Sequence, residues 1–444
     1  MQETVASALA QLSRTDPRVA QTAEHALSTL TAGEGLAGLN QRTVQKFCWQ
    51  VLPARYASSA EEQEFVVRSL GELFQLLGLS RYAEICTSAA TQEILAAHQR
   101  GSDTGNAAFE RHMRASGVEP PDLSELTWGT ALGSAEIEAY DATSAALELA
   151  IALGDVQPGT TGWRTAQERQ ARAFLTQPDD QGRSRLDKIR EERVRAWLSS
   201  AGHPHRQHLV PLLGQIIAGA DPPHSAHAAL SPVQRLLEFA SDGIALTQIG
   251  YLSPNVVREM CTEFDWTPVS TPPRSETDVT QIITLHKLLR SMRAVRRSGR
   301  RLILTRRGRR LRDSTESLWV AVAESVLNTD GFEQAATETL LGLLLVWSPR
   351  STGSHSSESA VDIAAEARTI LADAGWEKDT PRHGQRQSPV DSVLITVAWL
   401  LETLGCVSRV GLMHEQPTLT LTKVGRAFAL TAFHLSATTP RASL

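Results

Sequence analysis

The sequence contains few cysteines and no long apolar run, and each shortage excludes a class of protein. The four cysteines, Cys48, Cys86, Cys261 and Cys406, are far apart and form no Cys-x-x-Cys pair, so we expect reduced buried thiols rather than a zinc or disulfide framework. The longest apolar run, Leu340–Trp347 (LLGLLLVW), is shorter than the roughly 18 residues that cross a bilayer. The N-terminal segment has neither the basic nor the apolar region of a secretion signal. We therefore expect a cytoplasmic protein with no membrane partner.

Motifs that carry catalysis are also missing. The sequence contains no P-loop, HExxH, GxSxG or EF-hand pattern. The GxGxxG match at Gly33–Gly38 follows a helical segment rather than a strand, so we interpret it as a helix–helix loop. Four histidines that could form a metal site lie among prolines and small residues, where a polar linker is the favoured interpretation; they are His203, His205, His224 and His227. We expect no enzymatic activity and no cofactor.

Charge is distributed unevenly along the chain. Of the 44 basic residues only five are lysine, so the choice of arginine over lysine is not informative here and only its clustering is. The whole chain has a formal charge of −5, yet residues 1–160 hold 10 basic and 20 acidic residues, which leaves +5 for the remainder. The segment Lys287–Arg312 holds twelve basic and no acidic residues. Such asymmetry indicates an anionic partner for this part of the molecule.

The first 160 residues show helical rather than strand periodicity. Val66, Leu70 and Phe74 share one stripe with their neighbours Phe65 and Leu77, and Ser59-Ala-Glu-Glu62 before them is a capping box. We place the main domain boundary within residues 199–231, where prolines and glycines accumulate. The expected organisation is an acidic helical domain, a charged helix with a His- and Pro-containing connector, and two smaller modules; these cover residues 1–160, 161–230, 231–328 and 329–436.

Residues 231–328 are expected to contain a helix, a short strand in GIALTQIG (243–250), a second helix after Ser253-Pro254, a third over 278–292, and a β-hairpin around Ser298-Gly299. This order resembles the winged-helix fold, and LILTRRGRRL (302–311) resembles the LT-x-x-G-R phrase that follows the wing in many winged-helix regulators. The phrase recurs 117 residues later, at Leu421–Arg426, so residues 329–436 resemble a second, diverged copy. The expected fold class is mainly α: a helical N-terminal domain plus tandem winged helix-turn-helix modules with small β-wings.

The resemblance implies that the first module binds double-stranded DNA, with its third helix in the major groove and its wing along the backbone or in the minor groove. The outward side of the third helix would read base edges and contact phosphates. The next helix would favour a phosphate at its N-terminus, whereas His286 is expected at the edge of the core. The expected contact residues are Thr280, Gln281, Thr284, Lys287 and Arg290 on the helix, Arg296, Arg297, Arg300 and Arg301 on the wing, and Arg306 and Arg307 after it.

Other interpretations stay open. The arginines could dock on the acidic N-terminal half or on an acidic protein partner, or serve solubility alone. The second hairpin contains Glu415 beside Arg409, Lys423 and Arg426, so we expect it to pack or dimerise. Paired winged helices are interaction modules in some chromosome-organising and segregation proteins. We thus expect a transcriptional regulator or other DNA-associated factor, with a protein-assembly module as the alternative. The N-terminal half resembles only uncharacterised bacterial proteins and would oligomerise, bind a partner or sense an effector.

Overall fold

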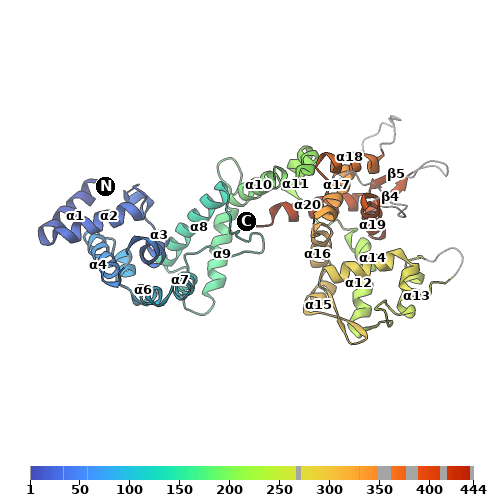
Figure 1. The fold of residues 1–444 in the computed structure, drawn as a ribbon, viewed down its shortest axis with the longest axis horizontal. Coiled ribbons are helices and arrows are strands. Elements are labelled where there is room, and N and C mark those ends of the chain that lie inside the picture. The colour runs from blue at the N-terminus through green and yellow to red at the C-terminus, as the bar shows by residue number, and fades with distance from the viewer. Residues whose placement is uncertain are drawn as a thin grey trace. The chain divides into compact units, whose positions relative to one another are not determined.

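The computed structural model describes residues 2–33, 35–57, 59–266, 272–329, 331–347, 362–376, 389–410 and 418–440. The chain divides into two compact units, one over Met1–Ile189 and one over Arg190–Thr439. Both units are mainly helical, which confirms this part of the prediction (Figure 1). No helix in the described ranges is long and apolar enough to cross a membrane.

The first unit is built from helices. Ser59 and Glu62 form the expected capping box at the start of α4, with N–H to side-chain oxygen distances of 3.2 and 3.3 Å. Val66, Leu70 and Phe74 of the expected stripe are buried in its core. Its helices are α1 Gln2–Thr15, α2 Pro17–Leu30, η1 Gly35–Gly38, α3 Gln41–Lys46, η2 Phe47–Tyr56, α4 Ala60–Leu76, α5 Ser80–Thr87, α6 Ala89–Arg100, α7 Ser102–Ser116, α8 Ser134–Leu153, α9 Trp163–Thr176 and the first part of α10 Arg185–Leu198.

The glycine-rich stretch at Gly33–Gly38 and the four cysteines were also predicted from the sequence. The GxGxxG stretch lies between α2 and α3 and contains the short η1 turn, so it is a helix–helix connection in the part that the structure describes. All four cysteines are buried and free, as predicted. The Sγ atoms of Cys48 and Cys86 lie 3.9 Å apart, and this contact together with burial raises the pKa of Cys48.

The second unit contains two successive groups of helices, each followed by a β-hairpin. The first group has the predicted order of helix, short strand, two helices and hairpin. The elements are η3 Pro204–Leu212, α11 Leu213–Ala218, α12 Ala226–Asp242, β1 Ile244–Ala245, α13 Pro254–Glu263, η4 Glu276–Asp278, α14 Thr280–Ser291, β2 Val295–Ser298, β3 Arg301–Leu304, α15 Arg306–Arg312, α16 Thr315–Leu327, α17 Gly331–Trp347, α18 Ile363–Asp373, α19 Pro389–Thr403, β4 Val407–Val410, β5 Thr418–Leu421 and α20 Lys423–Thr438.

The first hairpin belongs to an antiparallel sheet with strand order β1-β3-β2. Val295 pairs with Leu304, and Leu302 pairs with Ile244 of β1, and these side chains are buried. Alternation along the strands therefore attaches one face of the hairpin to the core and leaves the arginines outside it. Gly299 in the turn has φ +60°, a left-handed conformation that favours glycine.

The repeated LT-x-x-G-R phrase has the same structural role in both copies. Thr305 caps α15 by accepting a 3.0 Å hydrogen bond from the N–H of Gly308, and Thr422 caps α20 by accepting one of 3.0 Å from Gly425. A Cβ on Gly308 would lie 2.0 Å from the carbonyl oxygen of Ala294, and one on Gly425 would lie 1.8 Å from that of Cys406. Because only glycine allows this contact, the phrase marks where a helix starts against the first strand of its hairpin.

Residues expected in a polar connector contribute to the core of the second unit. Leu209, Leu212 and Ile216 of η3 and α11 are buried with the helices that follow. His205 and Arg206 are also buried, and both bond Glu338 of α17, at 2.8 Å from His205 and at 2.7 and 2.9 Å from Arg206. The histidines and prolines of this segment predicted a polar linker. In the structure, His205 and Arg206 are instead buried and hydrogen-bonded to Glu338, which is more than a hundred residues away in the sequence.

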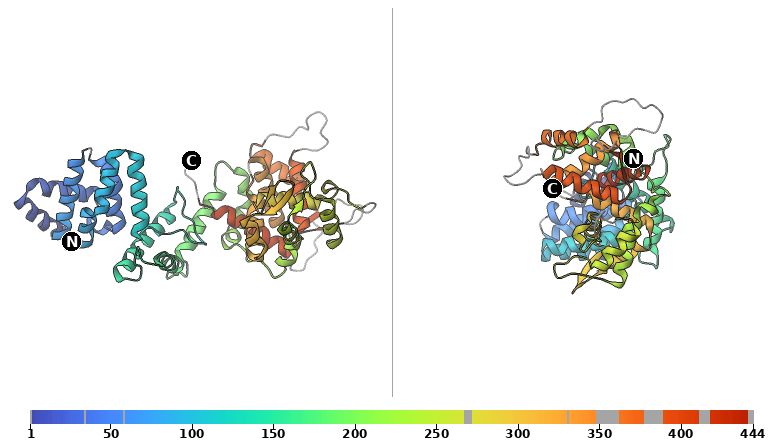
Figure 2. Two further views of the ribbon diagram at one scale, coloured as in Figure 1. Left: turned by 90° about the horizontal axis from the view of Figure 1, so that it is seen from below. Right: turned by 90° about the vertical axis from the view of Figure 1, so that its right-hand side faces the viewer.

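The two groups of helices in the second unit are packed together. α14 contacts α19, so the third helix of the first group lies against the corresponding helix of the second group. The last helix, α20, contacts α16, α17 and α11 and is drawn in red in Figure 2. Trp319 of α16 donates a 3.2 Å hydrogen bond to Thr431 of α20 inside this core. These contacts join both groups and residues 204–218 into one folded unit.

Candidate nucleic-acid interface

The predicted arginine cluster is exposed and largely without ion pairs. Of the twelve basic residues between Lys287 and Arg312, eleven are exposed and Arg312 is half-buried. Two of them form ion pairs, Arg307 with Glu324 at 3.3 Å and Arg312 with Asp313 at 2.8 Å. The other ten have no ion pair among the described residues. This segment therefore presents concentrated positive charge that the described residues of the second unit do not neutralise.

Several arginines elsewhere in the chain have carboxylate partners. Arg172 pairs with Glu125 at 2.8 Å and Arg195 with Glu191 at 2.7 Å, and Arg235 bonds both Glu238 and Glu263 at 2.9 Å. Arg111 pairs with Glu93. Other exposed arginines on helix faces, such as Arg68, Arg164 and Arg169, have no ion pair among the described residues. What distinguishes the hairpin segment is therefore the density of its cations, twelve basic and no acidic residues between Lys287 and Arg312.

The four wing arginines have different environments. Arg296 and Arg300 are exposed and make no side-chain hydrogen bond within the described ranges. Arg297 donates a 2.9 Å hydrogen bond to the carbonyl of Gly299. Arg301 donates to the carbonyl oxygens of Asp242 and Gly243, at 2.7 and 2.8 Å. Arg301 therefore caps the C-terminus of α12, a structural role that its sequence context did not predict.

The side of α14 that was predicted to contact DNA bases and phosphates is only partly exposed to solvent. Lys287 and Arg290 are exposed, whereas Thr280 and Gln281 are half-buried. Thr284 is buried at 7% exposure and donates a 2.8 Å hydrogen bond to the carbonyl of Thr280, so the prediction that its side chain faces solvent is wrong. Helical spacing places Thr284 on the outward half of α14, whereas in the structure its side chain is buried and α14 packs against α19.

His286 on the same helix is buried, as expected of a residue at the core edge. Its Nδ1 atom lies 2.8 Å from Oε1 of Glu276, which is itself buried. The other carboxylate oxygen of Glu276 accepts a 2.7 Å hydrogen bond from the backbone N–H of Leu252. Through Glu276 of η4, this network ties the middle of α14 to the segment between β1 and α13.

Three further cations belong to the exposed set beside the eight cations expected to contact DNA. Arg293 lies between α14 and β2 with φ +52°, and Arg309 and Arg310 lie on α15 beside the predicted Arg306 and Arg307. All three are exposed and have no side-chain partner in the described part of the chain. The local excess of arginine was visible in the sequence. The directions of the Arg309 and Arg310 side chains depend on where the short α15 begins.

The second hairpin offers less charge. Arg426, the counterpart of Arg309, is half-buried and donates to the carbonyl of Leu345 at 3.2 Å and to the side chain of Gln215. Lys423 is exposed, and Glu415 lies outside the described residues. Arg426 of the second phrase thus joins α20 to α17 and α11.

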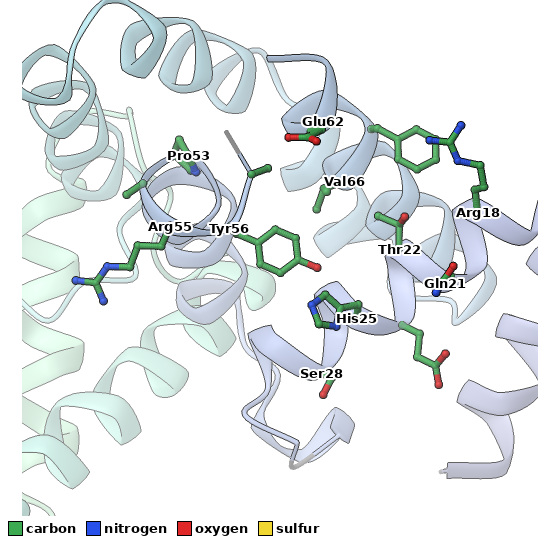
Figure 3. A pocket seen from close by; sticks show the side chains of 14 residues that line it. Arg18, Gln21, Thr22, His25, Ser28, Pro53, Arg55, Tyr56, Glu62 and Val66 are labelled. Carbon is green, nitrogen blue, oxygen red and sulfur yellow. The ribbon is translucent and has the colours of Figure 1, made fainter. Parts of the chain in front are cut away.

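A separate open groove of about 1310 Å³ lies in the first unit between α2, the end of η2 and the start of α4. Tyr56 extends from the end of η2 toward Thr22 and His25 of α2, and its ring centroid lies 5.5 Å from that of His25 (Figure 3). The lining carries charge of both signs, from Arg18, Arg55, Glu24 and Glu62. The groove therefore has no net charge preference that would select an anionic or a cationic ligand.

Of the histidines that were considered for a metal site, His203 and His205 have ring centroids 5.8 Å apart. His205 is held by Glu338, whereas His224 and His227 are exposed. Within the described ranges no group of three or more His, Cys, Asp or Glu side chains could hold a metal ion.

Comparison with protein-family models, with curated proteins and with solved structures found no match to this chain.

Proposed function

We propose that this protein binds double-stranded DNA through the arginine-rich hairpin and the exposed ends of α14 and α15, as a transcriptional regulator or another DNA-associated factor. The observation that carries the proposal is the set of ten cations without ion pairs between Lys287 and Arg310. Each guanidinium that neutralises a phosphate releases a condensed counterion, and arginine also bonds phosphate in a forked geometry.

We further propose that residues 231–328 are a winged helix and residues 329–436 a diverged copy. The element order, the β1-β3-β2 sheet and the identical roles of Thr305 and Thr422 support this assignment. The burial of Thr284 changes the binding mode that the resemblance implied. Binding would depend mainly on phosphates and on the minor groove, with Lys287 and Arg290 as the contacts that α14 provides.

A protein-assembly role is the second candidate, and the packing of α14 against α19 favours it. In that case the cations would bind an acidic protein surface. The two candidates differ in their salt dependence toward duplex DNA, because log K for phosphate binding falls linearly with log salt, with a slope of about −0.9 per phosphate neutralised.

The test compares the full-length chain with two double variants. Arg296→Ala with Arg300→Ala removes two unpaired charges from the wing. Arg111→Ala with Arg172→Ala removes two ion-paired charges from the first unit and is the matched control. By fluorescence anisotropy, the wing variant is expected to weaken duplex binding and to flatten the salt slope by about 2. If both variants bind as the wild type does, the wing does not contact DNA.

A further inference from the structure

Ile249 is an unusually exposed apolar side chain of the second unit. It is 76% exposed, more than any other large hydrophobic residue in the described part of the chain. Position 249 lies in a tight turn, where small and polar residues are preferred. An exposed isoleucine at such a position contributes nothing to the core, so its apolar surface is available to a partner.

The turn that carries Ile249 is well held. The N–H of Gly250 donates to the carbonyl of Thr247 at 3.1 Å, and the N–H of Thr247 donates to the carbonyl of Tyr251 at 2.8 Å. Gly250 has φ +91°, which favours glycine at this place. At the base of the turn, the buried Glu276 accepts a 2.7 Å hydrogen bond from Leu252. The turn therefore presents Ile249 in a defined position.

The same turn adjoins the tip of the arginine wing. The N–H of Leu246 donates a 2.8 Å hydrogen bond to the carbonyl of Arg300. A Cβ placed on Gly250 would lie 4.0 Å from Nη1 of Arg297. The backbone thus joins the isoleucine turn to the wing tip, and a surface that binds the wing arginines will also meet Ile249.

We propose that Ile249 is an apolar contact to duplex DNA that enters the minor groove beside Arg297 and Arg300. This inference rests on the proposed DNA-binding function. A narrow minor groove has an enhanced negative potential that attracts inserted arginines. An aliphatic side chain next to them is suited to pack against the sugars or to wedge between base pairs, as apolar side chains do in minor-groove binders. The turn and the wing together form one minor-groove contact.

The experiment uses the full-length chain and a mixed-sequence duplex that carries 2-aminopurine at flexible TA steps. Ile249→Ser removes the apolar group, Ile249→Met keeps one, and Val210→Ser, at a 53% exposed site on η3, is the matched control. We expect Ile249→Ser to weaken binding about tenfold, since burial of such a side chain corresponds to about that factor or more. Its salt slope should not change, because no charge is lost.

Ile249→Met and Val210→Ser should bind the duplex with the affinity of the wild type. The rise in 2-aminopurine fluorescence on binding should be smaller for Ile249→Ser than for the wild type. Two results would overturn the inference: equal binding by Ile249→Ser and the wild type, or an equal loss in the Ser and Met variants. Both results are compatible with DNA binding by the wild type, so neither of them would contradict the proposed function. If the wild type does not bind the duplex, the proposed function fails first and the inference fails with it.

Discussion

The guanidinium of Arg301 donates to the carbonyl oxygen of Gly243 at 2.8 Å, so an arginine in the wing is also the cap of α12. Its neighbour Arg300 makes no such bond and contributes only its backbone carbonyl to the fold. Two adjacent residues of identical chemistry are thus expected to respond differently to substitution.

Arg301→Ala should lower the free energy of unfolding by about 1 kcal/mol, because exposed carbonyls of α12 lose their donor. Arg300→Ala should leave it unchanged and weaken duplex binding. Denaturant unfolding and anisotropy, applied to both variants, separate the two effects. An equal loss of stability in both variants would contradict the assignment of Arg301 as a cap.

Arg293 offers a substitution that separates charge from stability. It occupies a left-handed conformation at φ +52°, whereas Gly405 has φ +60° at the same place before β4. A non-glycine residue in this region costs about 1 kcal/mol or more. Arg293→Gly should therefore fold with unchanged or greater stability while the salt slope of DNA binding flattens by about 1. Thermal unfolding together with anisotropy checks both, and an unchanged slope would exclude Arg293 from the interface.

Thr284 and Lys287 test which part of α14 meets DNA. Thr284→Val keeps the shape of a buried side chain and removes its 2.8 Å bond to Thr280, so it should change stability by about 1 kcal/mol or less and leave DNA affinity unchanged. Lys287→Ala should weaken binding and flatten the salt slope by about 1. Loss of affinity in Thr284→Val without loss of stability would restore the base-reading role that the sequence suggested.

Glu338 provides a test of the core of the second unit. Burial acts to raise the pKa of its carboxyl, but hydrogen bonds from His205 and Arg206 outweigh burial and hold the pKa below its ordinary value of 4.5. Glu338→Gln leaves Arg206 buried without its counter-charge, which typically costs about 3 to 5 kcal/mol. Denaturation followed by tryptophan fluorescence measures this loss, and wild-type stability in the variant would contradict it.

The pH dependence follows from the same depressed pKa. The contribution of Glu338 to stability is fully present above its unfolded-state pKa of about 4.5 and is lost as pH falls through the lower folded-state value. Wild-type stability should therefore decline below about pH 4.5, and the Glu338→Gln variant should lack this part of the decline. Parallel acid titrations of the two proteins compare the slopes directly.

Local features of this structure were predictable because local residues determine them. The capping box at Ser59, the hairpin turn at Gly299 and the helix starts at Thr305 and Thr422 all depend on side chains within a few positions. The concentration of arginine was likewise visible in the sequence, and most of the predicted wing and helix cations are exposed.

Long-range contacts were not predictable in this way. The bond between His205 and Glu338 joins residues 133 positions apart, and helical periodicity on each side gives no indication of it. Thr284 is buried, although its spacing alone placed it on an outward face, and α14 packs against α19 of the second group of helices. Similarly, the capping role of Arg301 depends on how β3 lies beside the end of α12.

The most direct test of the central claim is the salt dependence of duplex-DNA binding by the wild-type full-length chain, measured by fluorescence anisotropy. If half of the ten unpaired cations reach phosphates, log K should fall linearly with log salt with a slope of about −4.5. Tight binding at low salt that follows this line would establish the arginine segment as a phosphate-binding surface. No binding at low salt, or binding that does not depend on salt, would contradict the account and redirect the search to protein partners.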